Sequence, residues 1–556
     1  MVGLLSLPLA RGQEPDTAAQ ARQFIAEHEA KVRPLEIAQQ LADWDANTTG
    51  KESAFQAREQ AQNRLDEALA DPAKFARLKQ MHEALGKNTQ TGDRIIRREV
   101  DVLYLQYLGK QLDPALLKQI AAKEGAITKA FNAFRPKVEG KELTDSEVRE
   151  ILKTSRDPGQ RKATWEASKA VGRVVESDLK ELVGLRNEAA RKLGFKNYHV
   201  MAIYLNEQDQ QEVLRLFDQL DVLVREPFRA AKKRMDAQLA NLSGVKVADL
   251  RPWHYQDPFF QDPPAIDTGA ITAVYAHSDI LKLCREYYAG IGLPVDAVLA
   301  RSDLFEKPGK YPHAQCTDID REGDVRVIAN IVPNEYWAGT MLHELGHAVY
   351  SSIYIPRDVP YVLRGAAHTL TTEGIAMMFE KGALNTAWMT RMGLIVPEVE
   401  KVEARAAEAR RNHLLIFAAW TQVMFRFEKA LYENPAQDLN KLWWDLVERY
   451  QGVTRPEKRD APDYAAKIHI AQAPAYYHNY LMGELFASQL HHTIAREVLK
   501  TSPSKAQYVG KKEVGEFLKR KVFAPAATLP WNEMIQSATG EKLNPKAFAA
   551  DLKAGK

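Results

Sequence analysis

Apolar residues recur three and four positions apart through most of the chain after Asp16, and this spacing is typical of amphipathic helices. Short groups of Gly, Pro, Asn or Asp separate the helical segments, as expected where helices end. The pattern predicts an all-α protein, with helices over residues 54–85, 93–136, 145–154, 159–194, 209–241, 336–355, 367–386, 397–434, 437–450, 475–499 and 511–521.

One segment departs from the helical pattern. Residues 324–331 alternate β-branched and other side chains between Gly323 and Pro333, which predicts a strand and therefore a very small sheet. A Pro-rich passage between Arg251 and Pro264 carries four aromatic residues, and we expect it to pack against the body as a loop. The chain shows no internal repeat, so we expect one domain over residues 21–556.

Composition and charge exclude several classes of protein. The 556 residues include 76 Lys or Arg and 73 Asp or Glu, for a net charge of +3. This weak field does not favour nucleic acid or an anionic membrane as a partner. No apolar run reaches the roughly 18 residues that a membrane span needs. The two cysteines, Cys284 and Cys316, are too few for a disulfide scaffold or a four-cysteine metal site, although one bridge between them stays open.

Residues 1–20 have two interpretations. The apolar stretch from Gly3 to Ala10 resembles the end of a signal peptide, but no Lys or Arg precedes it. A disordered initiator segment explains the same residues equally well. Export would give a periplasmic or secreted protein, and the second interpretation leaves a cytoplasmic location open.

The strongest local motif is His343-Glu-Leu-Gly-His347. On a helix, residues four apart lie on one face, so both imidazoles can bind one metal ion while Glu344 holds a water molecule beside it. A hydrolytic zinc site needs a third protein ligand and an open fourth position. Glu373 is our choice, because it begins an apolar helical run where an unpaired carboxylate would be unfavourable. Glu380, two turns later on the same face, is the reserve ligand.

A peptide substrate would need further groups that bind its backbone and a developing oxyanion. His313 and Ala314 precede the predicted strand, whose exposed edge could pair with an extended peptide. A second segment gathers cationic, imidazole and phenol groups, and its members are Lys467, His469, Tyr476, Tyr477 and Tyr480.

In this order along the chain, these motifs resemble the angiotensin-converting enzyme family of zinc peptidyl-dipeptidases. The metal motif alone is shared by many zinc peptidases, and the ordered series around it is more specific. That series comprises Trp44-Asp-Ala-Asn-Thr48, His313-Ala314, residues 343–347, Glu373, Trp443-Trp-Asp-Leu446, Tyr450-Gln-Gly452, Lys467-Ile-His-Ile470 and Tyr477-His-Asn-Tyr480.

The resemblance implies a role for each matching residue. His343, His347 and Glu373 would hold one zinc ion, and Glu344 would activate water and protonate the leaving amine. His313 and Ala314 would bind the backbone of the substrate. Lys467 and Tyr477 would bind its terminal carboxylate. Tyr480 and His469 would bind the oxyanion. The family fold would be a largely helical ellipsoid, in which two helical halves surround a deep central channel and the small sheet lies near the zinc site.

Several positions depart from the family pattern. Its two chloride-binding arginines are replaced by Val447 and Asn479, which puts chloride activation in doubt. An acidic residue usually follows the glutamate ligand by four positions, and Met377 stands there. One extra residue lies between His469 and the tyrosines, so either Tyr476 or Tyr477 could contact the carboxylate. A glutamine should also bind it, and Gln256 is a weak candidate.

We expect oligopeptide substrates, no nucleic acid partner, and a monomer or weak dimer. Release of dipeptides from the C-terminus is the main functional hypothesis. A zinc carboxypeptidase or an oligoendopeptidase acting on short peptides is the first alternative. A peptide-binding protein without catalytic activity is the second, although Glu344 and Tyr480 argue against it, since a pure binder needs neither.

Overall fold

The computed structural model describes residues 17–87, 94–264 and 269–553. The predicted all-α class is confirmed, because helices dominate and the described strands form only two small sheets. The predicted N-terminal segment, residues 1–20, lies outside the described residues as far as Asp16. No helix in the described part of the chain is long and apolar enough to span a membrane.

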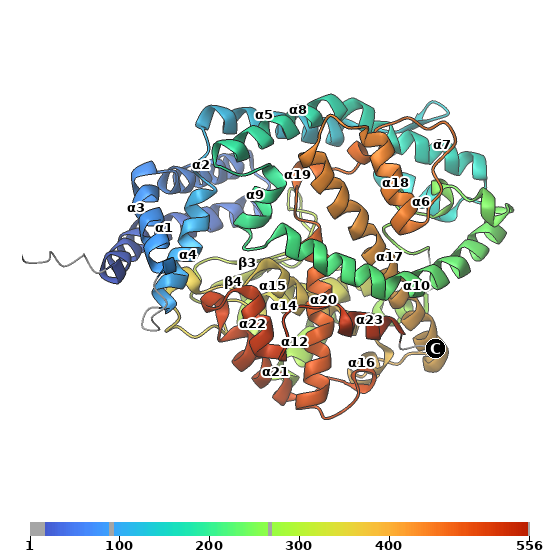
Figure 1. Cartoon of the computed structure of the whole chain (residues 1–556). Helices are drawn as coiled ribbons and strands as arrows, with labels where there is room; N and C mark the ends of the chain where they lie inside the picture. The colour runs from blue at the N-terminus through green and yellow to red at the C-terminus, as the bar shows by residue number, and fades with distance from the viewer. Residues whose placement is uncertain (1–16, 88–93, 265–268, 554–556) are drawn as a thin grey trace, which may run out of the picture.

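The chain forms two halves, an upper one and a lower one in Figure 1. The upper half begins with α1 (Thr17–Thr49), α2 (Glu52–Leu69), α3 (Pro72–Lys87), α4 (Arg94–Leu108), α5 (Pro114–Ala133), α6 (Asp145–Thr154), α7 (Pro158–Lys169), α8 (Val171–Lys192), α9 (Tyr198–Leu205) and α10 (Gln210–Ser243). It also holds α18 (Leu439–Gln451) and α19 (His469–Gln472).

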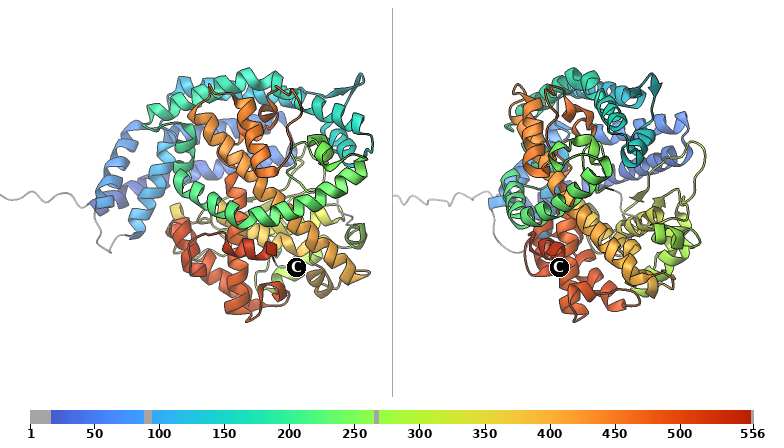
Figure 2. Two further views of the ribbon diagram at one scale, coloured as in Figure 1. Left: turned by 45° about the vertical axis from the view of Figure 1, so that its right-hand side comes forward. Right: turned by 90° about the vertical axis from the view of Figure 1, so that its right-hand side faces the viewer.

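The lower half contains the later helices. They are α11 (Gly269–Tyr275), α12 (Ile280–Gly290), α13 (Asp296–Arg301), α14 (Glu335–Val349), α15 (Thr369–Glu380), α16 (Thr386–Arg391), α20 (His478–Thr493), α21 (Lys512–Leu518), α22 (Trp531–Thr539) and α23 (Lys546–Lys553). The long helix α17 (Val399–Glu433) packs against α10 and α18 above and against α16 and α20 below, so it joins the halves (Figure 2).

Three predicted long helices are each divided in two, including residues 159–194, which form α7 and α8. Residues 54–85 form α2 and α3, because Pro72 starts a new helix, and residues 93–136 form α4 and α5. At the break between α4 and α5, Asp113 caps α5 by accepting hydrogen bonds from the amides of Ala115 and Leu116. The predicted helix over 475–499 begins at His478, since Ala475 has a left-handed backbone with φ +54°.

The predicted strand is shorter than expected and has a partner that the sequence pattern does not indicate. β4 (Val325–Ile328) pairs antiparallel with β3 (Gln315–Asp318), with Gln315 opposite Ile328. The other edge of β4 is covered, because Asp303 exchanges backbone hydrogen bonds with Val327 and Ala329. The exposed edge proposed for residues 324–331 is therefore wrong for β4. The second sheet joins β1 (Lys137–Val138) to β2 (Lys141–Glu142).

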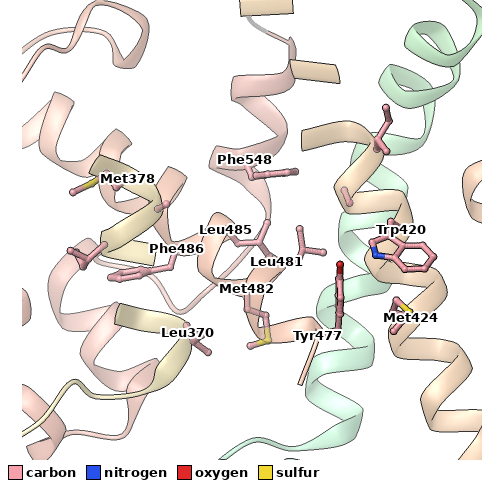
Figure 3. Packing of buried hydrophobic residues seen from close by; sticks show 14 of the residues in the cluster. Leu370, Met378, Trp420, Met424, Tyr477, Leu481, Met482, Leu485, Phe486 and Phe548 are labelled. Carbon is pink, nitrogen blue, oxygen red and sulfur yellow. The ribbon is translucent and has the colours of Figure 1, made fainter. Parts of the chain in front are cut away.

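The main hydrophobic core extends through both halves and is dense where α15, α17, α20 and α23 meet (Figure 3). Leu370 and Met378 of α15 lie on the side of α20 that carries Phe486, and Leu485 of α20 points toward Phe548 of α23. A second cluster lies beneath α1, α3 and α4. The main core fixes α15 against α20, and both helices carry candidate site residues.

Candidate active site

The three predicted metal ligands lie together. His343 and His347 come from α14, and their Nε2 atoms are 3.1 Å apart. Oε2 of Glu373 on α15 lies 3.6 Å from Nε2 of His343 and 3.9 Å from Nε2 of His347. Tetrahedral ligands at about 2.0–2.1 Å from a zinc ion would be separated by about 3.3 Å. The donor set therefore fits zinc, and it is the one such group found in the described part of the chain.

Two glycines let the ligand helices approach closely. A Cβ atom on Gly346, inside the histidine motif, would lie 2.7 Å from Cα of Ala376 on α15. A Cβ atom on Gly483 of α20 would lie 3.1 Å from Cβ of Glu373. Both distances are tight, so side chains at these positions would force the helices apart. Because Gly346 and Gly483 have no side chain, α14, α15 and α20 can lie close enough together to bring Glu373 beside the two imidazoles.

The second nitrogen of each histidine also has a partner. Nδ1 of His343 lies 2.9 Å from Oε2 of Glu380, and Nδ1 of His347 lies 2.8 Å from Oγ1 of Thr372. A proton on Nδ1 leaves the Nε2 lone pair directed toward the ligand cluster. Glu380, our reserve ligand, lies outside the ligand group and supplies the acidic partner that Met377 cannot.

The charges of the cluster shift its pKa values strongly. Burial lowers the pKa of His343, but the carboxylates of Glu373 and Glu380 outweigh burial and raise it to about 10. Burial and the neighbouring His343 lower the pKa of His347 to about 4. Burial would raise the pKa of Glu373, but the two imidazoles lower it overall. A bound cation would take the place of the shared proton, because ligands bind metals in their deprotonated forms.

Glu344 lies next to this cluster and is buried, with 8% of its surface exposed. Burial and the charge of Glu373 raise its pKa to about 7, although a hydrogen bond from the backbone amide of Cys316 in β3 lowers it. A carboxylate that titrates near neutrality suits a general base. The Cys316 thiol is free, as is that of Cys284, so the bridge left open by the sequence is absent.

His313 and Ala314 directly precede β3. The ring of His313 contacts Tyr311, with centroids 5.3 Å apart. Ala314 is two residues before Cys316, so its backbone groups point to the same edge of β3 as the amide that contacts Glu344. Ala314 therefore borders the edge of β3 that faces the candidate base Glu344.

A second cluster surrounds Lys467, whose Nζ lies 2.6 Å from Oε1 of Gln261. This ammonium group also lies 5.5 Å from the ring centroid of Tyr477 and 5.3 Å from that of Trp420. Burial lowers its pKa to about 8. A cation and an amide inside an aromatic wall can bind a carboxylate.

The amide of the weak candidate Gln256 donates to the carbonyl of Lys153 at 3.2 Å, so it is already bonded to the backbone. Gln261 is the glutamine that contacts Lys467. The carboxyl of Asp257 accepts hydrogen bonds from the amides of Phe259 and Gln261, and this turn sets the path of the loop. The sequence holds no signal for this glutamine, since its position depends on an irregular loop.

Tyr480 connects the metal ligands to the Lys467 cluster. Its pKa is raised by burial and then by the charge of Glu373, so the phenol lies within electrostatic reach of the ligands. On its other side, the ring of Tyr477 lies 5.6 Å away. Tyr477 in turn contacts His469 at 5.4 Å, and the pKa of His469 is lowered to about 4 by burial and by Lys467. His469 is therefore neutral near pH 7 and can donate one hydrogen bond.

Comparison with known proteins gives a consistent picture. A family model described as angiotensin-converting enzyme matches residues 15–234 and 254–550. The angiotensin-converting enzyme of Theromyzon tessulatum is 22% identical over 448 residues, which cover 74% of this chain and 71% of that protein. The Rattus norvegicus enzyme is 22% identical over 428 residues, 71% of this chain and 32% of that protein.

A third relative is the Mus musculus angiotensin-converting enzyme-like protein Ace3, which is 22% identical over 457 residues. The match covers 75% of this chain and 60% of the mouse protein. The chain therefore spans most of the length of the Theromyzon relative and about a third of the length of the rat relative.

Proposed function

Because this chain belongs to the angiotensin-converting enzyme family of zinc metallopeptidases, we propose that it releases dipeptides from the C-terminus of oligopeptides. One observation carries the proposal: the ring of Tyr480 contacts Tyr477, which borders Lys467, while the charge of the ligand Glu373 acts on the Tyr480 phenol. A peptide whose terminal carboxylate binds Lys467 would thus present an internal carbonyl to the metal site.

His343, His347 and Glu373 would hold a single zinc ion. When bound, zinc polarises the scissile carbonyl and lowers the pKa of water. Zinc suits two imidazoles and one carboxylate better than harder cations do. The orienting contacts from Glu380 and Thr372 support this assignment, because they direct both Nε2 atoms toward one point.

Glu344 would act as base and then as acid. It removes one proton from water as the C–O bond forms, and delivers that proton to the amide nitrogen as the C–N bond breaks. Its pKa of about 7 favours both transfers near neutrality. The Cys316 amide holds the carboxylate in place during this exchange.

Four further groups would bind the substrate and the oxyanion. Tyr480 and neutral His469 would each donate a hydrogen bond to the oxygen on which negative charge develops. His313 and Ala314 would bind the peptide backbone along the edge of β3.

The C-terminal carboxylate would bind Lys467, Gln261 and Tyr477. An aromatic wall excludes water from this cation and so strengthens a carboxylate contact. This cluster favours exopeptidase action over internal cleavage, because internal peptide segments offer no carboxylate at that point.

We further propose export to the periplasm or secretion, on the apolar N-terminal pattern, and an enzyme of one catalytic domain that is a monomer or a weak dimer. Chelation tests the proposed chemistry. Removal of zinc should abolish peptide hydrolysis, and added zinc should restore it. The Glu344→Gln variant should bind zinc normally and hydrolyse peptides at least about a hundredfold more slowly. Full hydrolysis by the chelated protein would contradict the proposal.

A further inference from the structure

The segment before α20 contains an unusual turn. Ala475 is buried and has φ +54°, a left-handed conformation that is unfavourable for a residue with a side chain. Its amide donates a hydrogen bond to Oε1 of Glu428 at 3.2 Å. Glu428 lies in α17 with only 1% of its surface exposed. The core of the protein therefore fixes the turn, and with it the direction of the next residue, Tyr476.

Three tyrosines follow one another across the site. The ring of Tyr480 contacts both of the others, with centroids 5.6 Å from Tyr477 and 5.3 Å from Tyr476, and both contacts are close to perpendicular. Tyr477 is buried against Trp420 (Figure 3), and Nζ of Lys467 lies 5.5 Å from its ring centroid. The contacts place Tyr476 against Tyr480 and Tyr477 against Lys467, so we take the two rings to flank Tyr480 on opposite sides.

Tyr476 also has a free polar end. The side chain is half-buried, and no hydrogen bond to its hydroxyl group is found among the described residues. Burial raises its pKa, and the charge of Glu373 raises it further, so the phenol is near the metal ligands. A half-exposed phenol beside the reacting groups is available to a substrate.

We propose that Tyr476 forms a wall of the subsite for the residue on the N-terminal side of the scissile bond. This inference rests on the proposed function. The released dipeptide would extend from Lys467 to Tyr480, so the preceding residue of an extended peptide lies beyond Tyr480, where Tyr476 stands. The ring occupies space that a large side chain would need, and the enzyme should therefore prefer a small residue at this position.

The test uses N-acetylated pentapeptides with a free C-terminus, Ac-Ala-Ala-X-Ala-Ala, in which X is Ala or Trp. In the Tyr476→Ala enzyme, the ratio of kcat/KM for Trp to kcat/KM for Ala should rise about tenfold or more over the wild type. Tyr476→Phe keeps the ring and should change the ratio less than about twofold. Tyr204→Ala, an exposed tyrosine on α9, is the matched control and should leave the ratio unchanged.

The same peptides separate this inference from the proposed function. Their Kd values for the Glu344→Gln protein, with and without Tyr476→Ala, compare the binding of the Trp and Ala peptides where turnover is strongly reduced. If no wild-type hydrolysis occurs but the Kd ratio shifts, the subsite stands and the proposed function fails. An unchanged ratio in both measurements would overturn the subsite. A shift that appears only in Ac-Ala-Ala-Ala-X-Ala, where X lies within the released dipeptide, would also overturn the subsite. Tyr476 would then lie on the C-terminal side of the scissile bond.

Discussion

The carboxylate of Glu380 lies 2.9 Å from Nδ1 of His343, while the other ring nitrogen, Nε2, lies 3.6 Å from Oε2 of Glu373. A carboxylate in this position fixes the tautomer and the orientation of a metal ligand. The Glu380→Gln and Glu380→Ala variants should bind zinc about 10–100-fold more weakly than the wild type. Competition with a fluorescent chelator measures this affinity directly. Unchanged zinc affinity in both variants would mean that Glu380 does not orient His343.

Gly346 should be intolerant of even one methyl group. The new Cβ atom of Gly346→Ala would lie 2.7 Å from backbone atoms of Ala376, so α14 and α15 must separate. We expect a loss of about 1–3 kcal/mol in the free energy of unfolding. Gly184→Ala in α8 is the control, because its Cβ meets nothing within 4 Å, and it should stabilise the protein by about 0.5–1 kcal/mol. Urea denaturation compares the two, and equal stabilities would contradict the proposed packing.

Lys467 should control substrate binding above neutral pH. Its ammonium form binds the carboxylate, and burial lowers its pKa to about 8, so that form is lost as pH rises through that value. kcat/KM for a free-acid peptide should therefore fall on the alkaline side with a midpoint near 8. The Lys467→Met variant should lack this limb. If the alkaline fall in kcat/KM persists in Lys467→Met, a group other than Lys467 causes it.

Gln261 should bind the same carboxylate, and Gln256 should not. Gln261→Leu removes the amide beside Lys467, and we expect KM for free-acid peptides to rise roughly tenfold, equivalent to about 1.4 kcal/mol. Gln256→Leu removes an amide that donates to Lys153, and KM should change less than about twofold. The reverse ranking of the two variants would place the carboxylate elsewhere.

Chloride should have little effect on activity. The two positions where the family carries arginines hold Val447 and Asn479, and Asn479 accepts a hydrogen bond from Gln208 at 2.7 Å. In the region that follows the Trp443-Trp444 pair, the buried carboxylate of Asp463 pairs with Arg459 at 2.6 Å. The positive charge of Arg459 is therefore already balanced by a carboxylate of the protein. Replacing sodium chloride by sodium acetate at constant ionic strength should change kcat/KM less than about twofold. Strong activation by chloride would show that an anion site remains.

Most helices and the metal ligands could be predicted from the sequence, because the patterns that indicate them are local. The helical spacing follows from one buried face per helix, and residues 343–347 place two imidazoles on one helical turn whatever surrounds them. The role of Glu380 is a partial exception. The sequence placed it on the face of Glu373, but which of the two carboxylates meets Nε2 depends on how α15 packs against α14.

Other features depend on tertiary structure. β3 has no alternating pattern, and it is a strand because β4 pairs with it. Gln261 reaches Lys467 only because Asp257 fixes the loop. The left-handed turn at Ala475 is held by Glu428, which is distant in sequence, so no local pattern indicates that helix α20 begins at His478.

Analysis of the products tests most directly whether the enzyme releases dipeptides from a free C-terminus. An N-acetylated hexapeptide with a free C-terminus and its C-terminally amidated copy are incubated with the zinc-loaded protein, and mass spectrometry identifies the products. We expect release of a C-terminal dipeptide from the free acid and little or no cleavage of the amide. Single released residues, or internal cuts that proceed equally in both peptides, would contradict the proposed role of Lys467 and the dipeptide rule.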